Sequence, residues 1–173
     1  MKRLIALAAA SLLLAGGATR AQSPNDAQIA FIVVTANQVD IDAGKLAESK
    51  ASSADVKAFG KQMVTDHSGV NKQAVALVTR LKVTPEDNAT AKSLKSGGAE
   101  NVARLEKLSG AAFDRAYVDH EVVYHEQVLE ALDKTLIPNA QNAELKALLV
   151  AVRPAFVAHL DHARHIQTSL KKG

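Results

Sequence analysis

Four long segments of this chain carry apolar side chains at alternating steps of three and four residues. This spacing puts the apolar side chains on one face of an α-helix and is typical of helices that pack together in a bundle. No segment shows a convincing two-residue alternation of a β-strand. The expected fold is therefore an all-α four-helix bundle, with helices at about residues 24–49, 53–81, 111–136 and 142–170.

The connection between the second and third of these helices is long enough for a crossover, which leaves their relative direction open. Residues 98–108 predict a short extra helix in this connection, packed across one end of the bundle. Gly44 in the first helix indicates close approach by a neighbouring helix. Pro154 in the fourth helix is expected to kink that helix or divide it in two.

Residues 1–21 have the pattern of a cleavable secretory signal peptide. Lys2 and Arg3 precede the apolar run 4–15, and Thr19 and Ala21 form an A-x-A-like cleavage signal. The run is too short to span a membrane, and no cysteine follows it that a lipid could modify. We expect a periplasmic protein whose residues 22–173 form a single helical-bundle domain without a transmembrane segment.

The charge of the mature chain argues against nucleic acid as a partner. Three of the 21 Lys and Arg residues (Lys2, Arg3 and Arg20) lie in the signal peptide, which leaves 18 against 18 Asp and Glu. A neutral chain with 3% aromatic residues has neither the positive surface nor the stacking side chains of a nucleic-acid-binding protein. The sequence defines neither the oligomeric state nor a physiological partner.

Three of the six histidines occupy positions where an apolar residue is expected. His67, His125 and His159 each interrupt an apolar stripe near the middle of a different predicted helix. Asp40 lies at a similar depth in the remaining helix. Mid-helix positions meet at one level of a bundle whichever way the helices run, so these four side chains are predicted to converge on a common centre.

Two neighbouring side chains extend the set of candidate ligands. Glu121 precedes His125 by one turn, and His162 follows His159 by three residues, so each pair shares a helix face. Imidazole nitrogen suits Zn, Cu, Ni and Fe. Asp66 and Asp161 adjoin histidines and are candidates to orient the imidazole rings. The candidate metal ligands are Asp40, His67, His125 and His159, with Glu121 and His162 as further candidates.

Two further roles for the buried histidines compete with a metal site. A single histidine on an apolar face is more often a core residue whose hydrogen bonds are satisfied, here by Asp40, Tyr117 or Tyr124. A haem carrier or redox enzyme, with Met63 or a histidine as axial ligand, is a third class. The paired Glu-x-x-His motifs of di-iron bundles are missing. No catalytic residues are assigned, and a non-catalytic role is favoured.

Several motifs resemble the bacterial envelope proteins grouped as domain of unknown function 4142. They are VDIDAGKLA at 39–47, VKAFGKQMVTDH at 56–67 and FDRAY at 113–117, followed by His125, Pro154 and His159. The resemblance implies a ferritin-like four-helix bundle, exported to the periplasm or outer membrane, with no established activity. It also implies an acidic residue at Asp40, where glutamate is usual, and histidines at 67, 125 and 159. Ferritin activity is not implied, because the full carboxylate set is missing.

The leading functional hypothesis is a periplasmic bundle whose interior His/Asp cluster holds one transition-metal ion (Zn, Cu, Fe or Ni). The alternative is a metal-free structural or stress-related envelope protein, in which the core histidines form a hydrogen-bond network.

Overall fold

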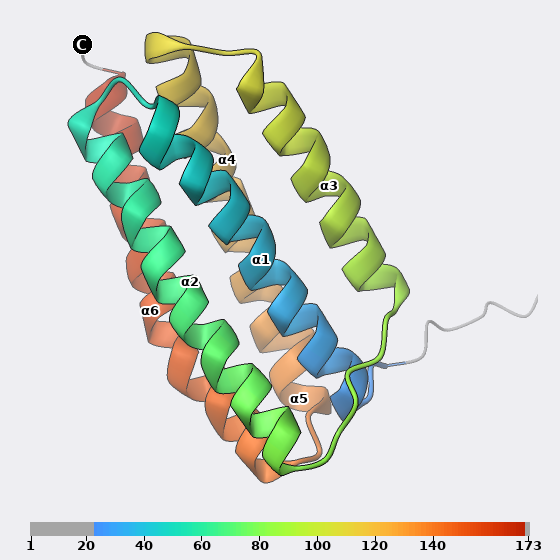
Figure 1. Ribbon diagram of the computed structural model, residues 1–173. Coiled ribbons are helices and arrows are strands. Elements are labelled where there is room, and N and C mark those ends of the chain that lie inside the picture. Colours follow the sequence, from blue (N-terminus) through green and yellow to red (C-terminus); the bar gives the residue numbers. More distant parts are fainter. Residues whose placement is uncertain (1–22, 172–173) are drawn as a thin grey trace, which may run out of the picture.

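The computed structural model describes residues 23–171, which form four long helices with a fifth helix alongside (Figure 1). No strand occurs in this range, as expected for an all-α chain. The predicted signal peptide, residues 1–21, lies outside the described residues. The elements are α1 (Asp26–Lys50), α2 (Ala54–Arg80), α3 (Ala89–Glu106), α4 (Gly110–Ala131), the π-helix η1 (Leu132–Leu136), α5 (Ile137–Asn139) and α6 (Ala143–Leu170).

The directions of the four bundle helices follow from their connections. A short turn joins α1 to the antiparallel α2, and a crossover containing α3 then returns the chain to the starting end of α2 (Figure 1). As a result α4 runs parallel to α2, and α6 runs antiparallel to α4. The structure thus answers the question of direction that the sequence left open, and the bundle has one long crossover connection.

The extra helix α3 differs from the prediction in length and position. It begins at Ala89 rather than at residue 98, and it lies lengthwise beside α1 rather than across an end of the bundle (Figure 1). Asn88 caps it by accepting a hydrogen bond from the backbone of Ala91. A Cβ added at Gly98 would lie 2.7 Å from a methyl carbon of Val39, so the two helices approach closely there. The buried residues of α3 are the small Ala91 and Gly98 together with Asn101 and Leu105.

A helical irregularity that the sequence did not predict lies at the end of the third bundle helix. The structure continues α6 through Pro154 without dividing it. Proline cannot bond to the carbonyl of residue 150 one turn earlier, but both Pro154 and Val150 are exposed, so water can reach that carbonyl. The predicted helix 111–136 instead widens at its end into the five-residue π-helix η1.

The core has three levels along the bundle axis. One apolar cluster lies at the end that carries α5, and a second lies at the end where α1 turns into α2; we call them the α5-end cluster and the turn-end cluster. The α5-end cluster contains Ile29, Leu77, Leu132, Leu149 and Phe156 among others. The turn-end cluster contains Ala47, Phe59, Met63, Phe113 and Tyr117 among others. Buried polar side chains occupy the level between them.

Two glycines let α1 and α2 touch backbone to backbone. A Cβ added at Gly44 would lie 2.8 Å from the carbonyl oxygen of Gly60, and a Cβ at Gly60 would lie 2.8 Å from the carbonyl oxygen of Gly44. Real Cβ atoms do not approach other atoms so closely. The close approach expected at Gly44 is therefore confirmed, and Gly60 on α2 is its partner.

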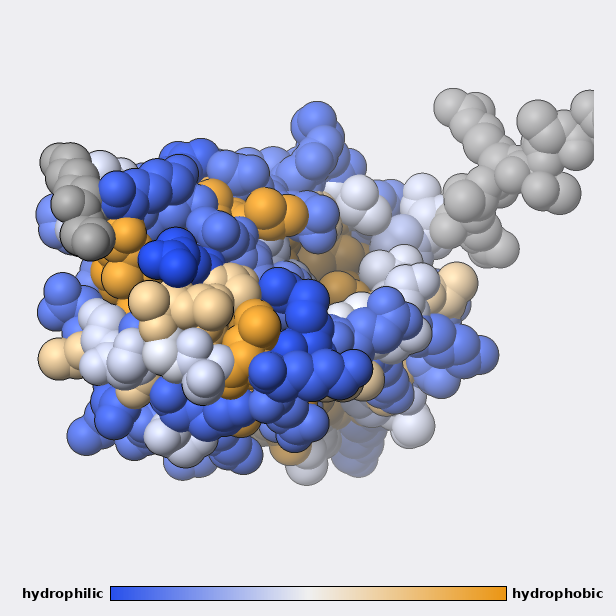
Figure 2. Space-filling view, turned by 90° about the horizontal axis from the view of Figure 1, so that it is seen from above, coloured by the Kyte–Doolittle hydropathy of each residue, from blue (hydrophilic) through white to orange (hydrophobic). Residues whose placement is uncertain are grey.

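The surface of the bundle is mostly polar. Seen end-on from the turn between α1 and α2, hydrophilic residues cover most of the face, and apolar ones show only in gaps between them (Figure 2). In residues 23–171 no helix combines the length and the apolar character needed to cross a membrane.

Candidate metal centre

The middle level of the bundle brings together one side chain from each long helix. Asp40 on α1, His67 on α2, His125 on α4 and His159 on α6 are each at most 2% exposed. The three imidazole centroids lie 5.3 to 5.7 Å apart. The convergence predicted from helix phase and depth is therefore present in the structure.

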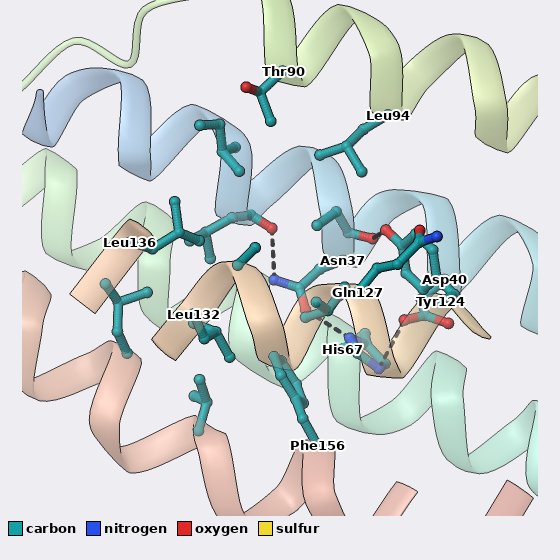
Figure 3. A pocket seen from close by; sticks show the side chains of 17 residues that line it. Asn37, Asp40, His67, Thr90, Leu94, Tyr124, Gln127, Leu132, Leu136 and Phe156 are labelled. Atoms are coloured by element: carbon teal, nitrogen blue, oxygen red, sulfur yellow. Dashed lines mark hydrogen bonds and ion pairs between the residues drawn. The ribbon is translucent and has the colours of Figure 1, made fainter. Parts of the chain in front are cut away.

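An amide side chain fixes the protonation of His67. Its Nδ1 lies 2.6 Å from Oδ1 of Asn37, whose own amide nitrogen donates to the carbonyl oxygen of Val33 at 2.8 Å (Figure 3). Because Oδ1 can only accept, Nδ1 of His67 must carry the proton. In the neutral ring the lone pair is then on Nε2, which lies 3.2 Å from Oδ2 of Asp40 without the alignment of a hydrogen bond.

The backbone of α4 fixes His125 in the same way. Its Nδ1 lies 3.0 Å from the carbonyl oxygen of Glu121, one turn earlier. A carbonyl oxygen accepts, so Nδ1 carries the proton and Nε2 keeps the lone pair. That Nε2 lies 3.9 Å from Oδ2 of Asp40.

A carboxylate on a neighbouring helix orients His159. Oδ2 of Asp66 on α2 lies 2.9 Å from Nε2 of the ring, so Nε2 donates and Nδ1 is left with the lone pair. The Asp66 side chain is 41% exposed, whereas His159 is buried. Asp66 thus reaches the cluster from the surface, and it orients a histidine of α6 rather than its chain neighbour His67.

Each of the three rings therefore donates one N–H to an acceptor and keeps one ring nitrogen with a free lone pair. The three remaining nitrogens, Nε2 of His67, Nε2 of His125 and Nδ1 of His159, have no hydrogen-bond partner among the described residues. One ligand nitrogen from each ring lies within 4.8 Å of those of the other two. An outward hydrogen bond that fixes the tautomer and orientation of an imidazole is the usual arrangement at metal-binding histidines.

Burial keeps these histidines neutral. Loss of hydration, followed by the proximity of His125 and His159, lowers the pKa of His67 to about 2. The pKa of His125 falls to about 4, again mainly because the ring is buried. Burial also lowers the pKa of His159, although the hydrogen bond from its ring to Asp66 opposes this effect. Neutral imidazole is the form that binds metal ions.

A pair of buried carboxyl groups adjoins the histidines. Asp40 and Glu121 are 2% and 1% exposed, and with His125 they form a second group whose ligand atoms lie within 4.8 Å of one another. Burial raises the pKa of both carboxyl groups, and that of Glu121 rises further because it faces Asp40. Two buried carboxylates side by side would repel each other, so the pair favours a state with at least one proton bound.

The remaining histidines lie away from the cluster. His162 is exposed, and its Nδ1 lies 3.1 Å from Oε1 of Gln62, while its ring packs edge-on against Phe59. It belongs to neither interior group, so the structure does not bring it together with His159 around one ion. His120 stacks on Tyr124, and His165 is exposed. Asp161 is 69% exposed and orients no ring of the cluster.

Asn37 is the residue of this site that the sequence pattern did not identify. It lies three residues before Asp40, and hence on the same face of α1, at a buried position. The sequence did contain a sign of its role, because Asn37 is a polar residue about one helical turn from the candidate ligand Asp40. The pairing of Asp66 with His159 had no such signal, because it joins helices that are 93 residues apart in sequence.

Comparisons with known proteins identify a family but no characterised relative. No curated protein and no solved structure matches the chain. The family model described as "Domain of unknown function (DUF4142)" matches residues 13–166, a span that contains Asp40 and all three clustered histidines. The chain therefore belongs to the DUF4142 family.

Proposed function

We propose that this protein holds one transition-metal ion at the middle level of its bundle, bound by His67, His125, His159 and Asp40. The observation that carries the proposal is the set of three free lone pairs. Each imidazole has its N–H engaged with a separate acceptor, and the three nitrogens left over are buried without a partner, in rings that each offer a ligand atom within 4.8 Å of the other two.

The donor set suits particular ions. Three neutral imidazoles and one carboxylate favour Zn, Cu, Ni or Fe over Mg and Ca, which prefer oxygen ligands. Because the pKa values of His67 and His125 are lowered to about 2 and about 4, protons do not compete for these rings at neutral pH. A cation beside Asp40 would favour its ionised form, so metal binding is expected to release the proton that the Asp40–Glu121 pair holds.

The rival to a metal ion is a metal-free hydrogen-bond network. In such a network each of the three free ring nitrogens would need a donor, and none of the described residues donates to them. Each buried polar atom left without a partner costs about 1–3 kcal/mol. A proton shared by the Asp40–Glu121 pair could reach one of these nitrogens, but one proton cannot satisfy three. This shortage of donors is the reason why we favour the metal ion.

The test is elemental analysis of untagged protein purified from its native host. Near-stoichiometric Zn, Cu, Ni or Fe is expected, together with its loss in the triple variant His67→Ala, His125→Ala and His159→Ala. The chain offers a matched control, because His120→Ala, His162→Ala and His165→Ala remove the same number of imidazoles outside the cluster. Substoichiometric metal that is equal in wild type and in both triple variants would rule the site out.

We also propose that the ion is bound in the periplasm, after export directed by residues 1–21. The support is the sequence pattern of a signal peptide and the absence of cysteine, which leaves metal binding to the histidines. Cell fractionation tests this location. Mass spectrometry should find the mature protein in the periplasmic fraction, beginning at Gln22. Recovery of the uncleaved chain from the cytoplasm would contradict it.

A further inference from the structure

The polar level of the bundle is open on one side to a cavity of about 210 Å³. Apolar side chains of the α5-end cluster form most of its wall, among them Ile32, Leu132, Leu149 and Phe156. Thr90 and Leu94 of α3 and the exposed Gln127 of α4 also line it, and Figure 3 shows Thr90 and Leu94 on the side away from His67. The cavity therefore extends from α3 to the interior cluster.

Two buried polar atoms on the cavity wall have no partner among residues 23–171. They are Oδ1 of Asp40 and Nε2 of His67. Two other polar side chains on this wall, Asn37 and Tyr124, are already engaged: Asn37 bonds to His67 and Val33, and the Tyr124 hydroxyl donates to the carbonyl oxygen of Ala36 at 2.9 Å. The cavity thus has an apolar body and one polar spot with free hydrogen-bonding capacity at its inner end.

We propose that this cavity binds a small neutral molecule with one aromatic ring and one hydroxyl group, whose hydroxyl meets Asp40 at the inner end. The size fits, since an apolar cavity of about 150 Å³ holds benzene and this one is somewhat larger. An aromatic ring would pack against Phe156, which already stacks on His67 at a centroid distance of 5.1 Å.

The polar end selects the chemistry of the ligand. A hydroxyl group both donates and accepts, so it can satisfy Asp40 whether that carboxyl is ionised or protonated. In the metal-free protein an anionic head would meet the buried Asp40–Glu121 pair and no compensating cation, because no Lys or Arg of the described chain lines the cavity. A purely apolar molecule would leave Asp40 unpartnered. A simple phenol meets all these requirements.

The test is a calorimetric titration of the purified protein, with and without its metal, using 4-methylphenol and toluene as probes. These probes differ only in the hydroxyl group. One saturable site is expected for 4-methylphenol, with toluene binding about fivefold more weakly because one hydrogen bond is lost. In Asp40→Leu this preference should disappear.

Two cavity-filling variants locate the site. Ala36→Leu and Ala131→Leu each place three extra carbons into the cavity wall, and each should weaken 4-methylphenol binding at least about tenfold. Ala58→Leu, at an exposed position of α2, is the matched control and should bind as wild type does. Absence of saturable binding would overturn the proposal, as would binding that survives in both filling variants.

This inference does not depend on the proposed metal site, and the readouts keep the two apart. Protein that binds 4-methylphenol but contains no metal would remove the metal proposal and leave the cavity proposal standing. Protein whose metal content is normal but which binds neither probe would do the reverse.

Discussion

The two apolar clusters that enclose the polar level are built differently. In the turn-end cluster Phe113 stacks on Tyr117 with ring centroids 6.3 Å apart, and Phe59 packs edge-on against Tyr117 at 6.2 Å. All three rings are fully buried. The α5-end cluster instead borders the 210 Å³ cavity, and one of its helices is irregular at η1. The interior cluster is therefore sealed by dense aromatic packing on one side and reached through a cavity on the other.

The largest expected loss of stability comes from replacing one phenylalanine in either apolar cluster by alanine. Phe59→Ala should lower the free energy of unfolding by about 3–5 kcal/mol, because it opens a new void in dense packing. The loss expected for Phe156→Ala is about 1–2 kcal/mol smaller than that for Phe59→Ala, because part of the Phe156 ring already borders the cavity. Urea denaturation of the metal-free variants measures both. Equal losses would show that the two clusters are packed alike.

The polar level between the clusters should make stability depend on pH, with an effect of intermediate size. The lowered pKa values of His67 and His125 mean that the unfolded chain binds protons more readily than the folded one. Metal-free protein should therefore lose a few kcal/mol, in order of magnitude, as the pH falls from about 6.5 to 4. The carboxyl pair acts in the opposite sense, since its raised pKa values favour the folded state at low pH.

The sign of the pH effect can be reversed by mutation. With His67, His125 and His159 all changed to Leu, the raised pKa values of the two carboxyl groups should outweigh the lowered pKa of the half-buried His120, which remains. Stability should then rise as the pH falls from 7 to about 4. The measurement is the urea midpoint at a series of pH values. A midpoint that still falls towards acid in this variant would show that other groups control the acid transition.

The smallest effect is expected at Glu121, on the side of the polar level that faces the turn-end cluster. Burial and the neighbouring Asp40 raise the pKa of Glu121, so Glu121→Gln keeps the shape of the side chain and the neutral form that its surroundings favour. Stability should change by less than about 1 kcal/mol, and the metal content should be retained. Asp40→Asn is the comparison, and it should lose metal. If Glu121→Gln loses metal to the same extent, Glu121 is itself a ligand and the centre extends towards the turn-end cluster.

The fold was largely predictable because large apolar residues mark the faces of all four bundle helices. The prediction was wrong where such residues are missing. Residues 89–97 of α3 are mostly small or polar, so their helix depends on the Asn88 cap and on close packing against α1. Nor could helix periodicity predict η1, because Leu132 and Leu136 fit an ordinary helical stripe.

The site was predictable in position but not in its supporting contacts. Phase and depth bring Asp40, His67, His125 and His159 to one level without any knowledge of the structure. Side-chain direction decides the rest: three residues separate His162 from His159, yet one faces solvent and the other the core. The acceptors that orient the rings depend on contacts between helices and on individual rotamers, which spacing does not encode.

The glycine contact between α1 and α2 has a consequence for evolution within this site. Gly44 is one turn beyond Asp40 on α1, and Gly60 is two turns before His67 on α2. Because neither glycine has a side chain, α1 and α2 lie as close together as their backbones allow. The distance between the side chains of Asp40 and His67 is therefore set by this backbone contact. Replacement of either glycine by alanine would push the two helices apart and lengthen the distance between Asp40 and His67, with all four clustered side chains unchanged. If the proposed metal is bound there, a relative could change its metal preference without altering a single proposed ligand.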